Sequence, residues 1–313
     1  GSGTDALHLA YILAGLKPGD EVITPVFTCT ATTIPFLYMG VTFRFADVDP
    51  LTLNIDVNHV RKLVNEKTRA IVCVHYGGLP CDMDELLAIG REYNIPVIED
   101  AAHALGATYK GKYVGSIADF TMFSFQAIKT ITTGDGGMLV VKDHALVPKG
   151  ERVRWFGIDR SNKQKGTWEN DITEVGYKYQ MTDIGAAMGL AALKEFDETL
   201  AYRQQLFAAY RKGLAGIKGI QLIGADATDR THASWLVTAL VDRRMDFMKK
   251  LRDHKIESGQ VHYRNDRYTV LGGRRHDLPN MDAVEERYIV LPLHLRMSIA
   301  DVDYVCKVIA SGW

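Results

Sequence analysis

Residues 95–141, IPVIEDAAHALGATYKGKYVGSIADFTMFSFQAIKTITTGDGGMLVV, contain the pattern that decides the fold. Three apolar runs in this stretch, residues 95–99, 118–125 and 137–141, have the length and residue types of buried strands. Strands that are apolar along most of their length are typical of a sheet covered by helices on both faces. The stretch therefore predicts the centre of an α/β fold.

The sequence before this stretch repeats the alternation of helices and strands. Apolar residues at helical spacing predict helices, and short apolar runs between them predict strands. The predicted helices are residues 4–16, 33–39, 56–65 and 83–93, and the predicted strands are residues 21–24, 41–46 and 69–75. This alternation favours crossover units and a mostly parallel sheet flanked by helices.

A long helical pattern covers residues 182–212, beyond the usual helix length of about 8–20 residues. Because long helices often bridge domains, we expect a large domain of residues 1–200 and a smaller C-terminal α+β domain of residues 201–313. In the smaller domain we expect strands at residues 233–241 and 261–264, and helices at residues 245–253 and 299–310.

The composition is that of an ordinary globular protein, with 47% hydrophobic and 24% charged residues. With 37 basic and 38 acidic residues, the chain has no charge excess that would indicate a nucleic-acid or membrane partner. The spacing of the four cysteines does not match a metal motif, so we expect free thiols and no metal. Without an apolar span or a signal peptide, a cytoplasmic location is expected. Because the first seven residues already form a motif, we also expect a further segment before them.

Asp100 and Lys129 are the first candidates for chemistry. Asp100 follows an apolar strand, where open parallel sheets bind ligands, although by itself this position favours a helix cap. A carboxylate there can pair with a protonated ring nitrogen. Lys129 lies between another apolar strand and a glycine-rich turn, where burial would lower the pKa of its amine and prepare it for Schiff-base formation. A single lysine is more often an exposed surface residue.

The start of the first predicted helix is a third candidate. Residues 2–7, SGTDAL, place a hydroxyl and a glycine where backbone amides could bind a phosphate. An ordinary Ser/Thr cap explains the same residues. What distinguishes this chain is the order: a helix start suited to phosphate, then an acid after a strand, then a lysine after another strand.

Several longer segments resemble the DegT/DnrJ/StrS family of pyridoxal-phosphate (PLP) sugar-nucleotide aminotransferases, which have the type I fold. The resemblance extends from residue 2 to about residue 195 and continues weakly over residues 291–305. The segments that carry it are SGTDALHLA (2–10), GDEVITPVFTCTAT (19–32), VIEDAAHALGATYKGKYVG (97–115), DFTMFSFQAIKTITTGDGGM (119–138) and GYKYQMTDIGAAMGL (176–190).

The resemblance implies a role for each matching residue. Lys129 would form the Schiff base with pyridoxal 5'-phosphate and move the substrate proton, Asp100 would pair with the ring nitrogen, and His103 would lie beside the ring. The family often has an aromatic ring at the position of Cys29, so stacking is expected from Phe27 or His103 instead. Residues Gly3, Thr4, Asp5 and Ser124 would hold the phosphate, together with Gln180 or Lys178 of the partner subunit in a homodimer with shared active sites.

The same resemblance implies glutamate as amino donor and a nucleotide-linked keto sugar as acceptor, with a 4-keto-6-deoxyhexose the favoured class. Amination of another keto sugar or a cyclitol, and a non-catalytic regulatory role, are the alternatives. Lys129 disfavours the family variant that has histidine there and performs dehydration. Residues 155–160 and 261–266 contain groups that suit sugars and diphosphates, and ordinary surface loops explain them equally well.

Overall fold

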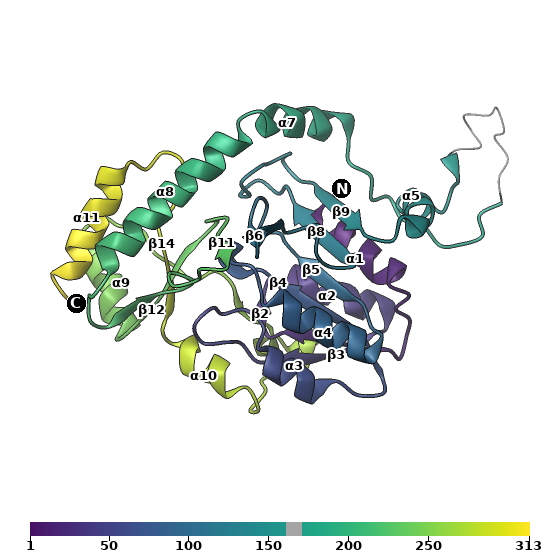
Figure 1. Cartoon of the computed structure of the whole chain (residues 1–313), viewed down its shortest axis with the longest axis horizontal. Helices are drawn as coiled ribbons and strands as arrows, with labels where there is room; N and C mark the ends of the chain where they lie inside the picture. The colour runs from purple at the N-terminus through teal and green to yellow at the C-terminus, as the bar shows by residue number, and fades with distance from the viewer. Residues whose placement is uncertain (161–170) are drawn as a thin grey trace.

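The central sheet has the strand order β3-β1-β4-β5-β8-β9 (Figure 1). This is a computed structural model, which describes residues 1–160 and 171–313. The strands are β1 (Glu21–Pro25), β3 (Thr42–Ala46), β4 (Thr68–Val74), β5 (Val97–Asp100), β8 (Phe120–Ser124) and β9 (Gly137–Val141). All neighbouring pairs are parallel except β8 and β9, which are antiparallel at one edge. The predicted α/β fold with a mostly parallel sheet is confirmed.

Helices cover both faces of this sheet because successive strand residues point to opposite sides. On β1, Val22 packs into one core while Ile23 packs into the other. The first core includes residues of α1 (Gly3–Leu13), α2 (Thr30–Met39) and α5 (Val147–Val153). The second includes residues of α3 (Val57–Leu63) and α4 (Met83–Tyr93). This two-sided burial explains why the strands read as continuous apolar runs.

The single helix predicted over residues 182–212 is wrong, because the chain forms α7 (Asp183–Leu193) and α8 (Phe196–Leu214) there. Between them, the amides of Lys194 and Glu195 bond to carbonyls three residues back, not four. Such tightened turns end a helix without proline or glycine. The apolar pattern continues across the break, so the sequence offers no stop signal.

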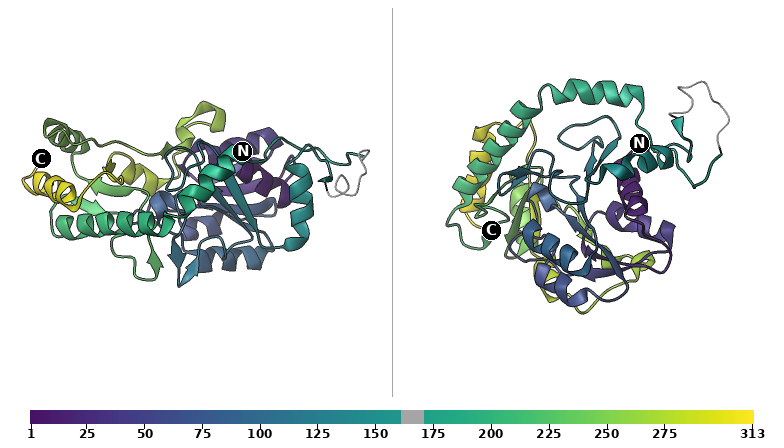
Figure 2. Two further views of the ribbon diagram at one scale, coloured as in Figure 1. Left: turned by 90° about the horizontal axis from the view of Figure 1, so that it is seen from above. Right: turned by 45° about the vertical axis from the view of Figure 1, so that its right-hand side comes forward.

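A second sheet lies towards the C-terminus, with the antiparallel order β10-β12-β14. It packs with α8, α9 (Arg244–Asp253) and α11 (Ile299–Ala310) around a separate core. Figure 2 shows α8 and α11 side by side at this end of the molecule. The strands are β10 (Ile220–Leu222), β12 (Val237–Val241) and β14 (Tyr288–Leu291). Residue 200 lies inside α8, and the division of the chain at that residue stays a prediction.

Short elements tie the C-terminal residues to the first half. Strand β13 pairs with β2, and β11 pairs with β6. None of the described helices combines the length and the apolar content needed to cross a membrane. The remaining elements are β2 (Phe27–Thr28), η1 (Tyr76–Gly78), β6 (Thr108–Tyr109), β7 (Lys112–Tyr113), η2 (His144–Leu146), β11 (Arg230–Thr231), β13 (Tyr263–Arg264), η3 (Asn265–Arg267), η4 (Thr269–Leu271) and α10 (Pro279–Glu285).

Candidate active site

The start of α1 packs directly against the carboxyl end of β8. The Ser2 hydroxyl caps the helix by accepting a hydrogen bond from the Asp5 amide, at 3.0 Å. A Cβ atom on Gly3 would lie only 3.0 Å from the Cβ of Ser124 and 3.1 Å from its Oγ. Glycine therefore permits this approach, and it brings the first turn of the helix beside a hydroxyl. Amides and a hydroxyl in this arrangement fit a phosphate, with Thr4 half-buried in the same turn.

Asp100 lies buried at the end of β5, next to β8 in the sheet. One carboxylate oxygen accepts a hydrogen bond from Thr32 Oγ1 at 2.7 Å, and the other accepts one from the Ala102 amide at 3.1 Å. Burial raises the pKa of Asp100, while these two hydrogen bonds and the nearby Lys129 act to lower it. The carboxylate is thus fixed in direction and keeps acceptor capacity for a further donor.

Lys129 lies in the loop that follows β8, with its side chain half-buried. Burial lowers the pKa of its amine to about 8, and the charges of Asp100 and Cys29 act in the opposite direction. A pKa near 8 leaves an appreciable fraction of neutral amine at physiological pH. The amine and the carboxylate are close enough to shift each other's pKa, and the start of α1 lies beside Ser124. Together these groups fit the aldehyde, the ring nitrogen and the phosphate of PLP.

Three aromatic rings complete the site. His103 stacks on Trp235 with ring centroids 3.9 Å apart and planes 14° apart, and it lies parallel to His262 at 5.2 Å. Burial keeps the pKa of His103 well below its usual value, so the imidazole is neutral. Sequence reasoning missed Trp235, because residues 233–241 were predicted as one strand, and it singled out His262 only as part of a polar segment.

Phe27, one of the two residues expected to stack on the cofactor ring, packs between two tyrosine rings. Its side chain is fully buried, with ring centroids 4.8 Å from Tyr76 and 4.9 Å from Tyr288. Cys29 is half-buried at the start of α2. His103 is the remaining candidate for packing against a cofactor ring.

Lys178 and Gln180, the two residues considered as the partner subunit's contribution to the site, belong to a segment that lies beside α1 of its own chain. The amino group of Gly1 donates to the carbonyl of Tyr179. The neighbouring Gln180 has a buried side-chain oxygen that finds no hydrogen-bond partner among the described residues. Lys178, the alternative candidate, places Nζ 3.6 Å from the centroid of the Trp155 ring. Gln180 is therefore the better candidate of the two, because its side-chain oxygen is still able to accept a hydrogen bond.

Arg264 is not available for a substrate diphosphate, so that interpretation of residues 261–266 is wrong for this side chain. It is fully buried and forms an ion pair with buried Asp266 at 2.6 Å. Further ion pairs join it to Asp282 and to Glu285, the latter at 3.0 Å. The guanidinium is therefore part of the folded scaffold.

Replacing Arg264 with glutamine should lower the free energy of unfolding by about 3 kcal/mol, because it leaves the buried Asp266 carboxylate without its charge partner. Urea unfolding followed by circular dichroism measures this. Arg267→Gln is the matched control, since Arg267 is exposed and lies over the Tyr263 ring. Equal loss of stability in the two variants would contradict the structural role of Arg264.

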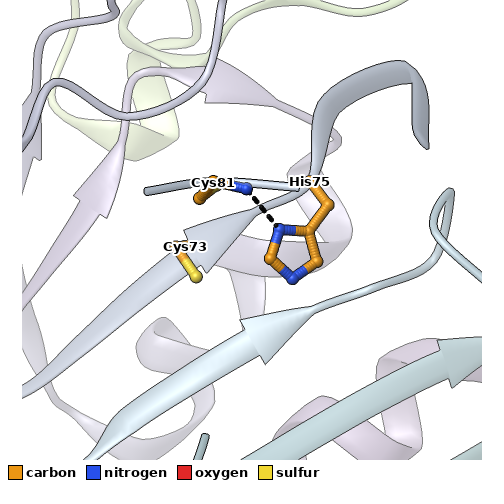
Figure 3. Close-up of side chains that lie close together, drawn as sticks. All are labelled: Cys73, His75 and Cys81. Atoms are coloured by element: carbon orange, nitrogen blue, oxygen red, sulfur yellow. Dashed lines mark hydrogen bonds between the residues drawn. The ribbon is translucent and has the colours of Figure 1, made fainter. Parts of the chain in front are cut away.

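Cys73, His75 and Cys81 form a buried cluster whose potential ligand atoms lie within 4.8 Å of one another (Figure 3). Both nitrogens of the His75 ring are already in hydrogen bonds, Nδ1 with the Cys81 amide at 3.0 Å and Nε2 with Glu99 at 3.2 Å. The His75 amide donates to the Asp100 carbonyl at 3.2 Å. These contacts support the strand end that carries Asp100, and the expected absence of a metal stays a prediction.

The chain is similar to known proteins over nearly its whole length. GDP-perosamine synthase of Caulobacter vibrioides is 38% identical over 97% of this chain and 82% of its own length. GDP-perosamine synthase of Escherichia coli O157:H7 is 35% identical over 98% of this chain and 82% of its own length.

Solved structures show the same fold. The sugar aminotransferase CalS13 from Micromonospora echinospora has a TM-score of 0.94 and 36% identity, over 99% of this chain and 86% of its own. The PLP form of Spr1654 from Streptococcus pneumoniae has a TM-score of 0.90 and 31% identity, over 99% of this chain and 85% of its own. The family profile matches residues 1–310, so the chain belongs to the DegT/DnrJ/EryC1/StrS aminotransferase family and is a PLP-dependent aminotransferase.

Proposed function

We propose that the protein transfers an amino group from glutamate to the keto group of a nucleotide-linked sugar, a 4-keto-6-deoxyhexose. The observation that carries the proposal is the half-buried Lys129 amine with a pKa of about 8 beside the buried Asp100 carboxylate. The two GDP-perosamine synthases similar over nearly the whole chain support the class of acceptor.

Lys129 would hold the cofactor through its amine and, whenever that amine is free, would act as the general base and acid of the reaction. A pKa near the working pH suits a group that must both accept and return a proton. Bound PLP supplies the electron sink for the substrate carbon that loses this proton. Asp100 holds the ring nitrogen protonated, and His103 packs beside the ring. Phosphate binding is assigned to Gly3, Thr4, Asp5 and Ser124.

Thr32 supports this arrangement through its hydrogen bond to Asp100. Replacing Thr32 with valine removes a bond to the charged form, so the pKa of Asp100 rises further. Activity falls as Asp100 becomes protonated on acidification. The acidic limb of the pH–rate profile should therefore move to higher pH by about one unit. Thr32→Ser keeps the hydroxyl and should restore the wild-type profile. An unmoved limb in Thr32→Val would contradict this role.

We also propose a homodimer in which the partner's surface completes the site. Helix α7 lies at the outer edge of the molecule (Figure 1), and only Gly185 on it is buried. Ile184 and Leu190 on this helix are 78% and 65% exposed. Apolar surface of this kind indicates a binding partner, and a second copy of the chain supplies one. Gln180, whose buried side-chain oxygen has no hydrogen-bond partner among the described residues, lies in the segment that we assign to this interface.

Absorbance spectroscopy and a panel of acceptors test the function. The purified holoenzyme should absorb visible light, glutamate should bleach this band, and 2-oxoglutarate should appear in equal amount. Nucleotide-linked 4-keto-6-deoxyhexoses should then restore the band. Restoration by a free keto sugar or a cyclitol ketone alone would reassign the acceptor. A band that no amino donor bleaches would favour a non-catalytic role.

A further inference from the structure

Trp235 reaches the candidate site from the segment between β11 and β12 and is held firmly there. Its side chain is 5% exposed. The backbone amide donates to the Gly77 carbonyl at 3.1 Å, and the backbone carbonyl accepts from Arg203 at 3.3 Å. The indole also stacks on His103. Because both backbone and ring are fixed, the indole presents a rigid surface to whatever lies against it.

Two contacts of this indole converge on one loop. The indole N–H donates to the carbonyl of Ile128 at 3.0 Å, directly before Lys129 in the chain. The Lys129 Nζ lies 4.0 Å from the centroid of the indole ring. Ile128 itself is 67% exposed, so its side chain adds little packing to hold the loop. Trp235 therefore holds the Lys129 amine in two ways, through the backbone carbonyl of Ile128 and through the Lys129 side chain itself.

We propose that Trp235 is a positioning residue that holds the free Lys129 side chain at the cofactor site, through the Ile128 carbonyl and the face of its ring. The attraction between a ring face and a cation acts on the ammonium and not on the neutral amine. The ring thus binds Lys129 while it carries a proton and releases it once the proton has been given up. In the reaction, this contact acts on Lys129 whenever the lysine is not attached to the cofactor. This catalytic consequence rests on the proposed function.

The direction of the pKa effect follows from the two opposing influences. Burial favours the neutral amine and gives the pKa of about 8, while the ring face favours the ammonium. Leucine at position 235 keeps the apolar surroundings and removes the ring face. Trp235→Leu should therefore lower the pKa of Lys129 by about one unit. Trp235→Phe retains a ring face and should leave that pKa close to the wild-type value.

The test uses the cofactor-free protein, so it needs neither substrate nor turnover. The rate at which an acylating reagent modifies Lys129 is measured against pH by peptide mass spectrometry, which yields the pKa of this amine. Hydrogen exchange of the amides of residues 127–130 is followed in parallel. Both Trp235→Phe and Trp235→Leu lose the indole N–H, so both should exchange faster in this loop than the wild type.

Trp313→Phe is the matched control. The Trp313 indole N–H donates to the Asp242 carbonyl at 2.7 Å, in the part of the chain that packs against α9. This variant should change neither the loop exchange nor the pKa of Lys129. In the holoenzyme, Trp235→Leu should lower kcat by about tenfold with KM for glutamate little changed, and Trp235→Phe should recover most of this loss.

A wild-type labelling profile in Trp235→Leu, or unchanged loop exchange in both variants, would overturn the proposal. If Trp235→Leu does not fold, Trp235→Met provides a second side chain without an aromatic face, judged by the same two measurements. A protein that shows the labelling and exchange changes but aminates no keto sugar would refute the proposed acceptor and leave the role of Trp235 intact.

Discussion

Replacing Lys129 with alanine will reduce kcat/KM for transamination by about 10⁴-fold or more and will abolish the visible absorbance of the holoenzyme. The variant removes both the attachment point of the cofactor and the group that moves the proton. His103 cannot replace it, because an imidazole does not form a Schiff base and the lowered pKa of His103 makes this ring a weak proton acceptor. Stopped-flow absorbance with glutamate, together with the steady-state release of 2-oxoglutarate, measures the two losses separately.

Lys142→Ala is the control for this substitution. Lys142 is an exposed lysine that follows β9, and its backbone amide, which alanine retains, donates to the Asp119 carbonyl. The control should keep the visible band and wild-type turnover. A Lys129→Ala protein that still aminated a keto sugar at the wild-type rate would show that another amine carries the reaction.

The site residues that could be proposed from the sequence are those whose surroundings are local in the chain. Asp100 follows an apolar run, and in a parallel sheet the carboxyl end of a strand is where ligands bind. The start of α1 is recognisable from a hydroxyl and a glycine before an apolar helix. Ser124 ends the strand that pairs with β5 in the sheet, and its role in phosphate binding came from the family resemblance. In each case the local pattern gives the position, while the order of the motifs and the family resemblance give the role.

The residues that were missed are those whose position depends on distant packing. Trp235 meets Lys129 only because β12 begins at Val237, later than the apolar pattern indicates, and leaves the tryptophan in a loop. Thr32 lies 68 positions from Asp100 in the chain and reaches it through the packing of α2 on the sheet. For the segment that contains Arg264, diphosphate recognition and an ordinary surface loop were held equal, because a buried ion-pair partner cannot be recognised from a polar segment alone.

Asp100→Asn tests the other end of the proposed cofactor site. Asparagine has nearly the same shape and can still accept from the Ala102 amide, so the fold should be retained. Its neutral amide cannot hold a pyridine nitrogen protonated, because that requires a charge in a site where burial has removed water. We expect kcat to fall by about 10²- to 10³-fold, the size of a lost buried charge pair.

The matched control is Asp119→Asn, because Asp119 also accepts a backbone hydrogen bond, from the Val97 amide at 2.9 Å, at the opposite end of β5. It should leave kcat near the wild-type value. The pH profile separates an electrostatic role from a structural one: Asp100→Asn should lose the acidic limb that depends on this carboxylate, while the melting temperature stays close to that of the wild type. If Asp100→Asn keeps wild-type kcat, the carboxylate does not act on the cofactor ring, and Asp100 only caps the segment that follows β5.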